Sequence, residues 1–241
     1  MRPIDIPTGE VSRFVRDHLP AQPARILEVG CGSGDLALRL QQDGHDLVAL
    51  DESEAAVQQV SAKGITAHHG HWPDFEDEPF DAILFTRSLH HIWPLDPALD
   101  QVMHLLKPDG VVMVEEFDFP AARPTEVAWL YGTLRLLEAC DQLDLHTESL
   151  ASRLLAGDGD YALWRRGEDL HPVSAILNAL VERFDLTVNE SSAHLYRFVI
   201  PLLSDDATGY ELAARLLDME QRLADSGALA RIGRRFVGQK R

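Results

Sequence analysis

The chain has 241 residues, of which 45% are hydrophobic and 25% are charged, as in ordinary globular proteins. Its 22 Lys and Arg residues against 39 Asp and Glu residues give a formal net charge of −17, which repels polyanions and argues against a nucleic-acid partner. No apolar run approaches the ~20 residues of a membrane span, and the segment "MRPIDIPTGE" lacks the apolar core of a signal peptide. We therefore expect a cytoplasmic protein without a membrane span.

Apolar runs and amphipathic segments alternate along the first half of the chain. After a predicted helix at 8–19, strands are expected at 25–30, 46–51, 65–69, 80–85 and 111–117. The intervening helices are predicted at 35–44, 54–64 and 96–106. Strands and helices that alternate at this spacing form parallel βαβ units. We expect a doubly wound, Rossmann-like α/β sheet, whose ligands bind at the carboxyl ends of the strands.

The alternation ends after Phe119. Helices are predicted at 124–140 and 147–156, then from Pro172 onward, and finally at 207–224. Two apolar segments, 184–190 and 193–200, are close enough in sequence to form an antiparallel hairpin.

The basic tail at 231–241 contains no acidic residue. We expect it to be a solvated terminus; docking onto an acidic partner, or onto the protein's own acidic surface, is the alternative. The elements together predict a single domain over 1–241. Its expected parts are a cofactor-binding half at 1–118, a helical insertion or lid at 119–171, and the last strands with a C-terminal helix at 172–241.

The stretch "ILEVGCGSGD" at 26–35 joins a predicted strand to a helix through glycines spaced by single residues. A phosphate-binding P-loop would need GxxxxGK[ST], but Gly34 is followed by Asp35. A dinucleotide site would need GxGxxG, and Asp35 stands where its last glycine would be. A carboxylate at a helix N-terminus also competes for the position of a pyrophosphate. A ligand without phosphates is therefore favoured.

S-adenosylmethionine is such a ligand, because acidic side chains can hold its hydroxyls and ammonium group while glycines let the backbone approach. The segment "LEVGCGSG" resembles the first motif of class I S-adenosylmethionine-dependent methyltransferases, including Glu28 ahead of the glycines. "EPFDAILFTRSLHHI" and "LDPALDQVMHLLKPDGVVMVEE" resemble the family's later motifs in the same order. Within this family the chain is similar to the small-molecule enzymes of quinone biosynthesis.

The resemblance is strong over 24–118 and implies a seven-stranded sheet with its last strand antiparallel and a helical insertion after the fifth strand. It implies S-adenosylmethionine as the cofactor, S-adenosylhomocysteine as the product and a small-molecule acceptor, and it leaves the oligomeric state open. Asp51 would hold the ribose hydroxyls and Arg87 the donor's carboxylate. The expected cofactor-binding residues are Glu28, Gly30, Cys31, Gly32, Gly34, Asp51, Glu52, His71, Trp72, Thr86 and Arg87.

Several positions in this set carry alternatives. Arg87 could instead form a surface salt bridge, and Cys31 is expected to be a small residue tolerated in the turn, with a catalytic thiol as the alternative. The family often has an acid after the third strand, near the adenine, but this chain has His71 there. Trp72 either packs against the adenine or is a half-buried loop aromatic. The helical insertion carries the aromatic residues Trp129, Tyr131 and Trp164, which form either an acceptor surface or the insertion's own core.

Methyl transfer is an in-line displacement, and a base assists it when the acceptor is a hydroxyl or an acidic carbon. His90 and His91 follow the fourth strand and are the predicted bases, although either could instead serve a structural role there. Glu115 and Glu116 end the fifth strand; Glu115 is the one predicted to face the acceptor.

No metal is expected, since the histidines at 68, 69 and 71 lack a further ligand nearby. Two other function classes remain open. Gly30, Gly32 and Asp51 would also suit an NAD(P)-dependent oxidoreductase, which Asp35 argues against. A non-catalytic S-adenosylmethionine-binding protein would carry the same loop.

Overall fold

The computed structural model describes residues 1–20, 22–145, 149–165 and 170–241, which cluster into two compact units. The sheet unit comprises residues 9–116, 171–190 and 234–241. The helical unit comprises residues 1–8, 117–170 and 191–233. It therefore includes the predicted insertion together with the last helix of the chain. None of the described helices is both long and apolar enough to cross a membrane.

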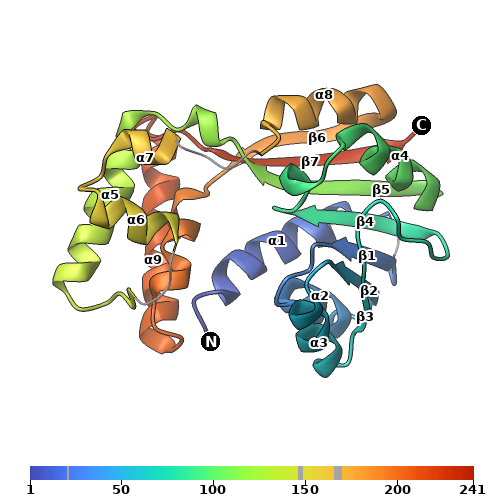
Figure 1. Cartoon of the computed structure of the whole chain (residues 1–241), viewed down its shortest axis with the longest axis horizontal. Coiled ribbons are helices and arrows are strands. Elements are labelled where there is room, and N and C mark those ends of the chain that lie inside the picture. The colour runs from blue at the N-terminus through green and yellow to red at the C-terminus, as the bar shows by residue number, and fades with distance from the viewer. Residues whose placement is uncertain (21, 146–148, 166–169) are drawn as a thin grey trace. The chain divides into compact units, whose positions relative to one another are not determined.

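A seven-stranded sheet runs in the order β3-β2-β1-β4-β5-β7-β6 (Figure 1). Pairing is parallel from β3 through β5, in agreement with the predicted βαβ units. The strands are β1 (Arg25–Val29), β2 (Asp46–Asp51), β3 (Thr66–His69), β4 (Phe80–Thr86), β5 (Leu106–Phe117), β6 (Phe184–Ser192) and β7 (Gly233–Lys240). β5 begins earlier than expected, because the Lys-Pro-Asp-Gly segment already belongs to the strand.

Helices cover both faces of the sheet, since neighbouring residues of each central strand face opposite cores. Leu27 and Phe85 belong to one core, whereas Ile26 and Leu84 belong to the other. The helices of this unit are α1 (Asp5–His18, from Gly9 onward), α2 (Asp35–Gln42), α3 (Glu54–Ala62), α4 (Leu95–Leu105), α8 (Val173–Arg183) and the 3₁₀ helix η1 (Leu89–His91). The predicted doubly wound fold is confirmed.

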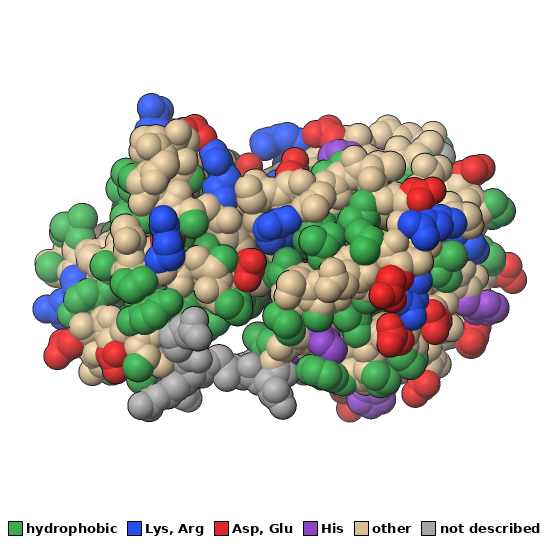
Figure 2. All heavy atoms as spheres, turned by 90° about the horizontal axis from the view of Figure 1, so that it is seen from above, with side chains coloured by type: hydrophobic (Ala, Val, Ile, Leu, Met, Phe, Trp, Pro, Cys, Tyr) green, Lys and Arg blue, Asp and Glu red, His purple; other side chains and the backbone are tan. Residues whose placement is uncertain are grey.

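Ion pairs join α4 to α8 on one face. Arg183 of α8 lies 3.0 Å from Asp96 and 2.8 Å from Asp100, both of α4. Figure 2, which looks onto α8, shows acidic and basic side chains next to one another on this part of the sheet unit. Arg183 thus offsets part of the negative charge of α4 and α8 on this face.

The structure confirms that the last strand of the sheet is antiparallel, but it corrects which segment pairs with residues 184–190. Arg235 near the start of β7 meets Glu115 near the end of β5, and Lys240 at the end of β7 meets Leu106 at the start of β5. Gly233 likewise lies against Ser192 and Gly238 against Phe184, so β7 runs opposite to both β5 and β6. The predicted hairpin partner at 193–200 is wrong: it forms the 3₁₀ helices η3 (Leu195–Phe198) and η4 (Ile200–Leu202). Its backbone amides find another acceptor, because the buried Glu220 accepts from three of them at 2.7–3.0 Å.

The expected solvated tail is also wrong. Residues 233–240 are strand β7, and Phe236 and Val237 are buried in the two cores. Arg235 lies 2.9 Å from the buried Glu115, and Arg241 lies 2.8 Å from Asp185. The alternative that the tail docks on the protein's own acidic residues is therefore correct, and the pairing partners come from distant sequence.

The helical unit has a core of its own. Trp164 is fully buried in it and stacks on Phe119 with ring centroids 4.4 Å apart, while Trp129 and Tyr131 pack against it from partly exposed positions. The insertion's aromatic residues thus serve its own core. The elements are η2 (Phe119–Ala121), α5 (Pro124–Ala139), α6 (Leu150–Ala156), α7 (Tyr161–Arg165), η3, η4 and α9 (Ala207–Asp225). α6 was expected from 147; residues 147 and 148 lie outside the described chain.

Candidate functional site

The glycine loop after β1 turns on left-handed backbone at Gly30, where φ is +73°. The Gly30 amide donates to Leu50 O at 2.8 Å, which fixes the loop against the end of β2. A Cβ at Gly30 would lie 2.5 Å from the Cβ of Ser88, whereas a Cβ at Gly32, also left-handed at +52°, would meet nothing within 4 Å. Position 30 therefore needs glycine for both its conformation and its packing.

We expect Gly30→Ala to lower the free energy of unfolding by about 2 to 4 kcal/mol, through left-handed strain plus overpacking. Gly32→Ala is the control and should cost about 1 to 2 kcal/mol, since only strain applies. Urea unfolding measures both. Adding Ser88→Gly should recover the packing part of the Gly30→Ala loss relative to Ser88→Gly alone. Equal losses at positions 30 and 32 would contradict the packing argument.

Asp51 ends β2 directly beside this loop. Its Oδ2 accepts the amide of Gly32 at 2.8 Å and its Oδ1 accepts the amide of Ser53 at 2.9 Å. A carboxylate has about four acceptor positions, so Asp51 can accept further hydrogen bonds from a ligand. The carboxylate therefore orders the loop and also offers acceptors to the adjoining space.

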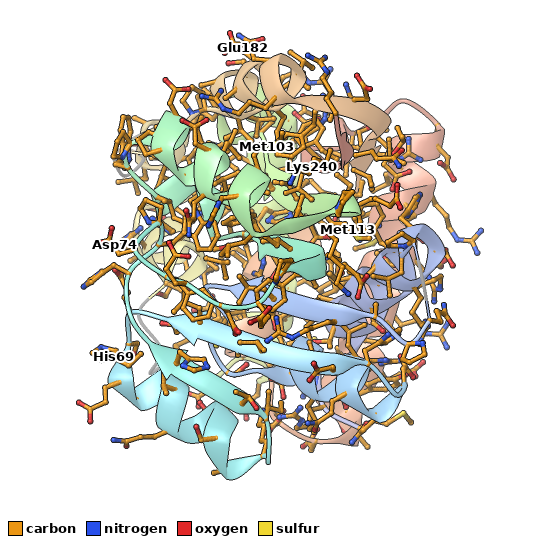
Figure 3. All side chains as sticks on the ribbon, turned by 90° about the vertical axis from the view of Figure 1, so that its right-hand side faces the viewer. His69, Asp74, Met103, Met113, Glu182 and Lys240 are labelled. Atoms are coloured by element: carbon orange, nitrogen blue, oxygen red, sulfur yellow. The ribbon has the colours of Figure 1, made fainter. Side chains whose placement is uncertain are left out.

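A pocket of about 750 Å³ opens at the carboxyl ends of β1, β2, β3 and β4. Its volume is in the range of small-molecule and cofactor sites. Six of the predicted cofactor-binding residues contribute to its wall: Gly30, Asp51, Glu52, His71, Trp72 and Arg87. Figure 3 shows His69, at the end of β3, and the pocket residue Asp74 on the same side of the sheet unit. The site lies at the sheet edge that the sequence predicts.

The β3 side of the pocket is polar at its rim and apolar behind it. His71 Nδ1 lies 3.3 Å from the exposed Glu52 carboxylate. Trp72 is largely buried, donates its indole N–H to Ala98 O at 3.0 Å and packs edge-on against Phe85. The indole of Trp72 is thus part of the core as well as of the pocket wall.

Glu28 and Thr86 lie behind the pocket wall. Thr86 Oγ1 donates to Glu28 Oε1 at 3.2 Å, and Glu28 Oε2 has no hydrogen-bond partner within the described residues. Burial raises the pKa of Glu28 to about 8, although the bond from Thr86 opposes the shift. Burial also raises the pKa of the Cys31 thiol to about 12, and nearby carboxylates add to this. A reactive thiolate at Cys31 is therefore disfavoured.

Lys63 holds the far side of the glycine loop, which the sequence did not reveal. Its Nζ donates to Ser33 O at 2.6 Å and to Asp35 Oδ1 at 3.1 Å. Gly34, between these two residues, is also left-handed, and a Cβ there would lie 2.5 Å from Val60 of α3. Asp35 is thus paired inside the protein, and α3 braces the loop. A lysine so far along the chain leaves no local signal.

The two predicted bases differ in environment. His91 is exposed and lines the pocket. His90 is buried; its ring Nδ1 pairs with the Glu116 carboxylate, and its amide donates to Glu116 Oε1 at 3.2 Å. Burial raises the pKa of Glu116, and the hydrogen bonds with His90 oppose that shift. The rings of His90 and His91 lie 4.1 Å apart, so the buried pair supports the residue that faces the pocket.

Glu115 is placed differently from its predicted role. Its side chain is buried, and Arg235 Nε donates to its Oε1 at 2.9 Å. This contact joins β5 to β7, which gives Glu115 a structural function. A role of Glu115 in catalysis remains a prediction, because Glu115 does not line the pocket.

Among the residues that the structure describes, no group of three or more His, Cys, Asp and Glu side chains could hold a metal ion.

The sheet order, the glycine loop of β1 and the carboxylate that ends β2 define a Rossmann-like methyltransferase fold. A family model described as a methyltransferase domain matches residues 8–150, more than half of the chain. The chain therefore belongs to this family of methyltransferase domains, and the class predicted from the loop motif is confirmed.

Two curated relatives illustrate the similarity. An uncharacterized methyltransferase of Staphylococcus carnosus is 32% identical over 117 residues, 46% of this chain and 56% of the relative. A demethylmenaquinone methyltransferase of Beutenbergia cavernae is 30% identical over 125 residues, 50% of this chain and 51% of the relative. The chain thus spans about half the length of these relatives. The predicted similarity to quinone-biosynthesis enzymes is present in the sequence.

Solved structures agree with the fold. The plantazolicin methyltransferase BpumL in complex with SAH superposes with a TM-score of 0.55, covering 97% of this chain and 82% of that one. Its sequence is 14% identical, so the likeness concerns the fold alone.

Proposed function

We propose that this protein transfers a methyl group from S-adenosylmethionine to a small-molecule acceptor. The observation that carries the proposal is that one pocket has both Asp51 and His91 in its wall. Asp51 ends β2 beside the glycine loop, and His91 lies in the loop after β4. A carboxylate suited to a ribose and an imidazole suited to a proton transfer thus face one space.

The residues of this pocket fit such a donor. Asp51 keeps acceptor positions for hydroxyls, and Arg87 in the same wall can bind a carboxylate. A positively charged ligand in the pocket would lower the pKa of Glu28, which burial raises to about 8. When bound, S-adenosylmethionine supplies an electrophilic methyl group on a sulfonium. Glu28 and Thr86 would then support the loop from behind.

In this proposal His91 accepts the proton that a hydroxyl or acidic-carbon acceptor loses as it is methylated. His90 and Glu116 hold the backbone and ring next to it. Trp72 and the apolar residues behind it exclude water from the β3 side of the pocket. No covalent intermediate with the protein is needed, because positioning accounts for most of the catalysis of an in-line displacement.

Calorimetry with S-adenosylhomocysteine tests the donor half of the proposal. We expect saturable binding at micromolar concentrations and no stabilisation of the fold by NAD(P)H. Absence of binding at tens of micromolar would reject the proposal, and stabilisation by NAD(P)H would favour the oxidoreductase. Transfer of a labelled methyl group to an acceptor panel tests the other half. Tight binding without transfer to any acceptor would indicate a non-catalytic S-adenosylmethionine-binding protein.

A further inference from the structure

Trp93 is an exposed aromatic residue in the wall of the pocket. Its side chain is 58% exposed, and it follows His91 in the loop that leaves β4. A large indole left in water forgoes the free energy of burial. The pocket therefore presents an uncovered aromatic surface close in sequence to the proposed base.

The indole is held in place from behind. The ring of His171, at the start of α8, stacks on it with centroids 3.5 Å apart and an angle of 25°. The His171 ring Nε2 lies 3.0 Å from Ile92 O, and the His171 amide donates to His90 O at 3.0 Å. Because His171 covers one face of the indole, the exposed area belongs to the other face and the ring edges. A flat surface fixed in this way can bind without losing rotamer entropy.

Trp93 lies in the loop after β4, which it shares with Arg87 but not with the other proposed donor groups. Gly30 and Asp51 come from β1 and β2, and His71 and Trp72 come from the loop after β3. The sheet order places β4 on the other side of β1 from β2 and β3. Trp93 and His91 therefore come from the loop after β4, whereas the residues that we assign to the adenosine come from the ends of β1, β2 and β3.

We infer that Trp93 is an acceptor-specificity residue, which binds a planar, conjugated ring of the acceptor by stacking. This inference rests on the proposed function and specifies its acceptor class. An indole face favours an offset-stacked aromatic partner over a saturated ring of similar size. Such a ring, lying on Trp93, would place its substituents within the part of the wall that contains His91.

The test uses the full chain saturated with S-adenosylhomocysteine and a panel of planar phenols and indoles, each paired with its saturated-ring counterpart. Calorimetry and quenching of tryptophan fluorescence measure binding. We expect planar members to bind and their counterparts to bind about tenfold or more weakly. Labelled methyl transfer with S-adenosylmethionine gives KM and kcat for every planar member that reacts. No binding by any planar member at millimolar concentrations would overturn the inference.

Three substitutions at position 93 separate planarity from apolar area. Trp93→Ala and Trp93→Leu should both weaken planar ligands by about tenfold to a hundredfold, whereas Trp93→Phe, which keeps a flat ring, should retain most of the affinity. Leu136→Ala, at an exposed apolar residue of α5, is the control and should change nothing. Equal affinity in Trp93→Leu and Trp93→Phe would overturn stacking as the mode of binding.

S-adenosylhomocysteine affinity keeps the two proposals apart. It should be unchanged in every Trp93 variant, and a tenfold loss in Trp93→Ala would assign Trp93 to the donor instead and overturn the inference. Failure of the unsubstituted protein to bind S-adenosylhomocysteine would reject the proposed function itself. If donor binding is normal and the affinity for planar ligands is the same in all Trp93 variants, only the acceptor role of Trp93 is rejected.

Discussion

His91→Ala is expected to lower kcat for methyl transfer by about 10²- to 10⁴-fold with an acceptor that must lose a proton, which is the usual contribution of a positioned base. His91 is exposed in the pocket wall, while the neighbouring His90 is buried against Glu116. S-adenosylhomocysteine affinity should be unchanged, because the proposed donor contacts are made by Asp51 and Arg87 and not by His91. Steady-state kinetics and calorimetry on the same preparation measure the two quantities.

The pH–rate profile sharpens this prediction. An imidazole base must be neutral to accept a proton, so the unsubstituted protein should gain activity as pH rises through the titration of a histidine, and His91→Ala should lose that limb. His104→Ala is a suitable control, since His104 is an exposed histidine of α4 outside the pocket wall. Unchanged kcat in His91→Ala, or the same loss in both variants, would remove His91 from the chemistry.

Asp51→Ala is expected to weaken S-adenosylhomocysteine by about 10²- to 10³-fold. The substitution removes the acceptor of the Gly32 and Ser53 amides, and it also removes the carboxylate that we assign to the ribose hydroxyls. Hydrogen bonds to a charged group are worth about 1.5 to 3 kcal/mol each, and every 1.4 kcal/mol corresponds to about a factor of ten in affinity. Calorimetry gives the change in Kd directly.

Asp46→Ala provides the matched control for Asp51→Ala. Asp46 lies at the opposite end of the same strand, where it is exposed and 3.3 Å from Arg25, so the change in residue and in net charge is identical. Its donor affinity should equal that of the unsubstituted protein. If Asp46→Ala weakens donor binding as much as Asp51→Ala does, the effect comes from net charge or from the strand, and the ribose assignment fails.

Local signals explain why most of the sheet and half of the site could be predicted. Buried parallel strands are short continuous apolar runs, and the glycine loop has its own conformational requirement at Gly30. Since all parallel strands end at one edge, Gly30, Asp51 and His91 had to meet once the strands were correctly identified. The structure brings them into one pocket wall.

Other parts of the site have no local signature. The exposure of Trp93 depends on packing, and its brace His171 is 78 positions further along the chain, at the start of α8. Lys63 reaches the glycine loop only because α3 packs against it. The different environments of His90 and His91 likewise depend on Glu116 of β5, whose carboxylate pairs with the ring of His90.

The sequence by itself determined the parallel strands, the glycine loop and the family to which the chain belongs, because each is encoded in contiguous residues. Only the tertiary structure decided which segments form the antiparallel end of the sheet. There β6 pairs with β7, which lies near the C-terminus, while the Glu220 carboxylate accepts hydrogen bonds from the amides of residues 194–196. Neighbours in sequence compete with distant partners for the same hydrogen bonds, and burial of Phe236 and of the Glu115–Arg235 pair selects the distant strand.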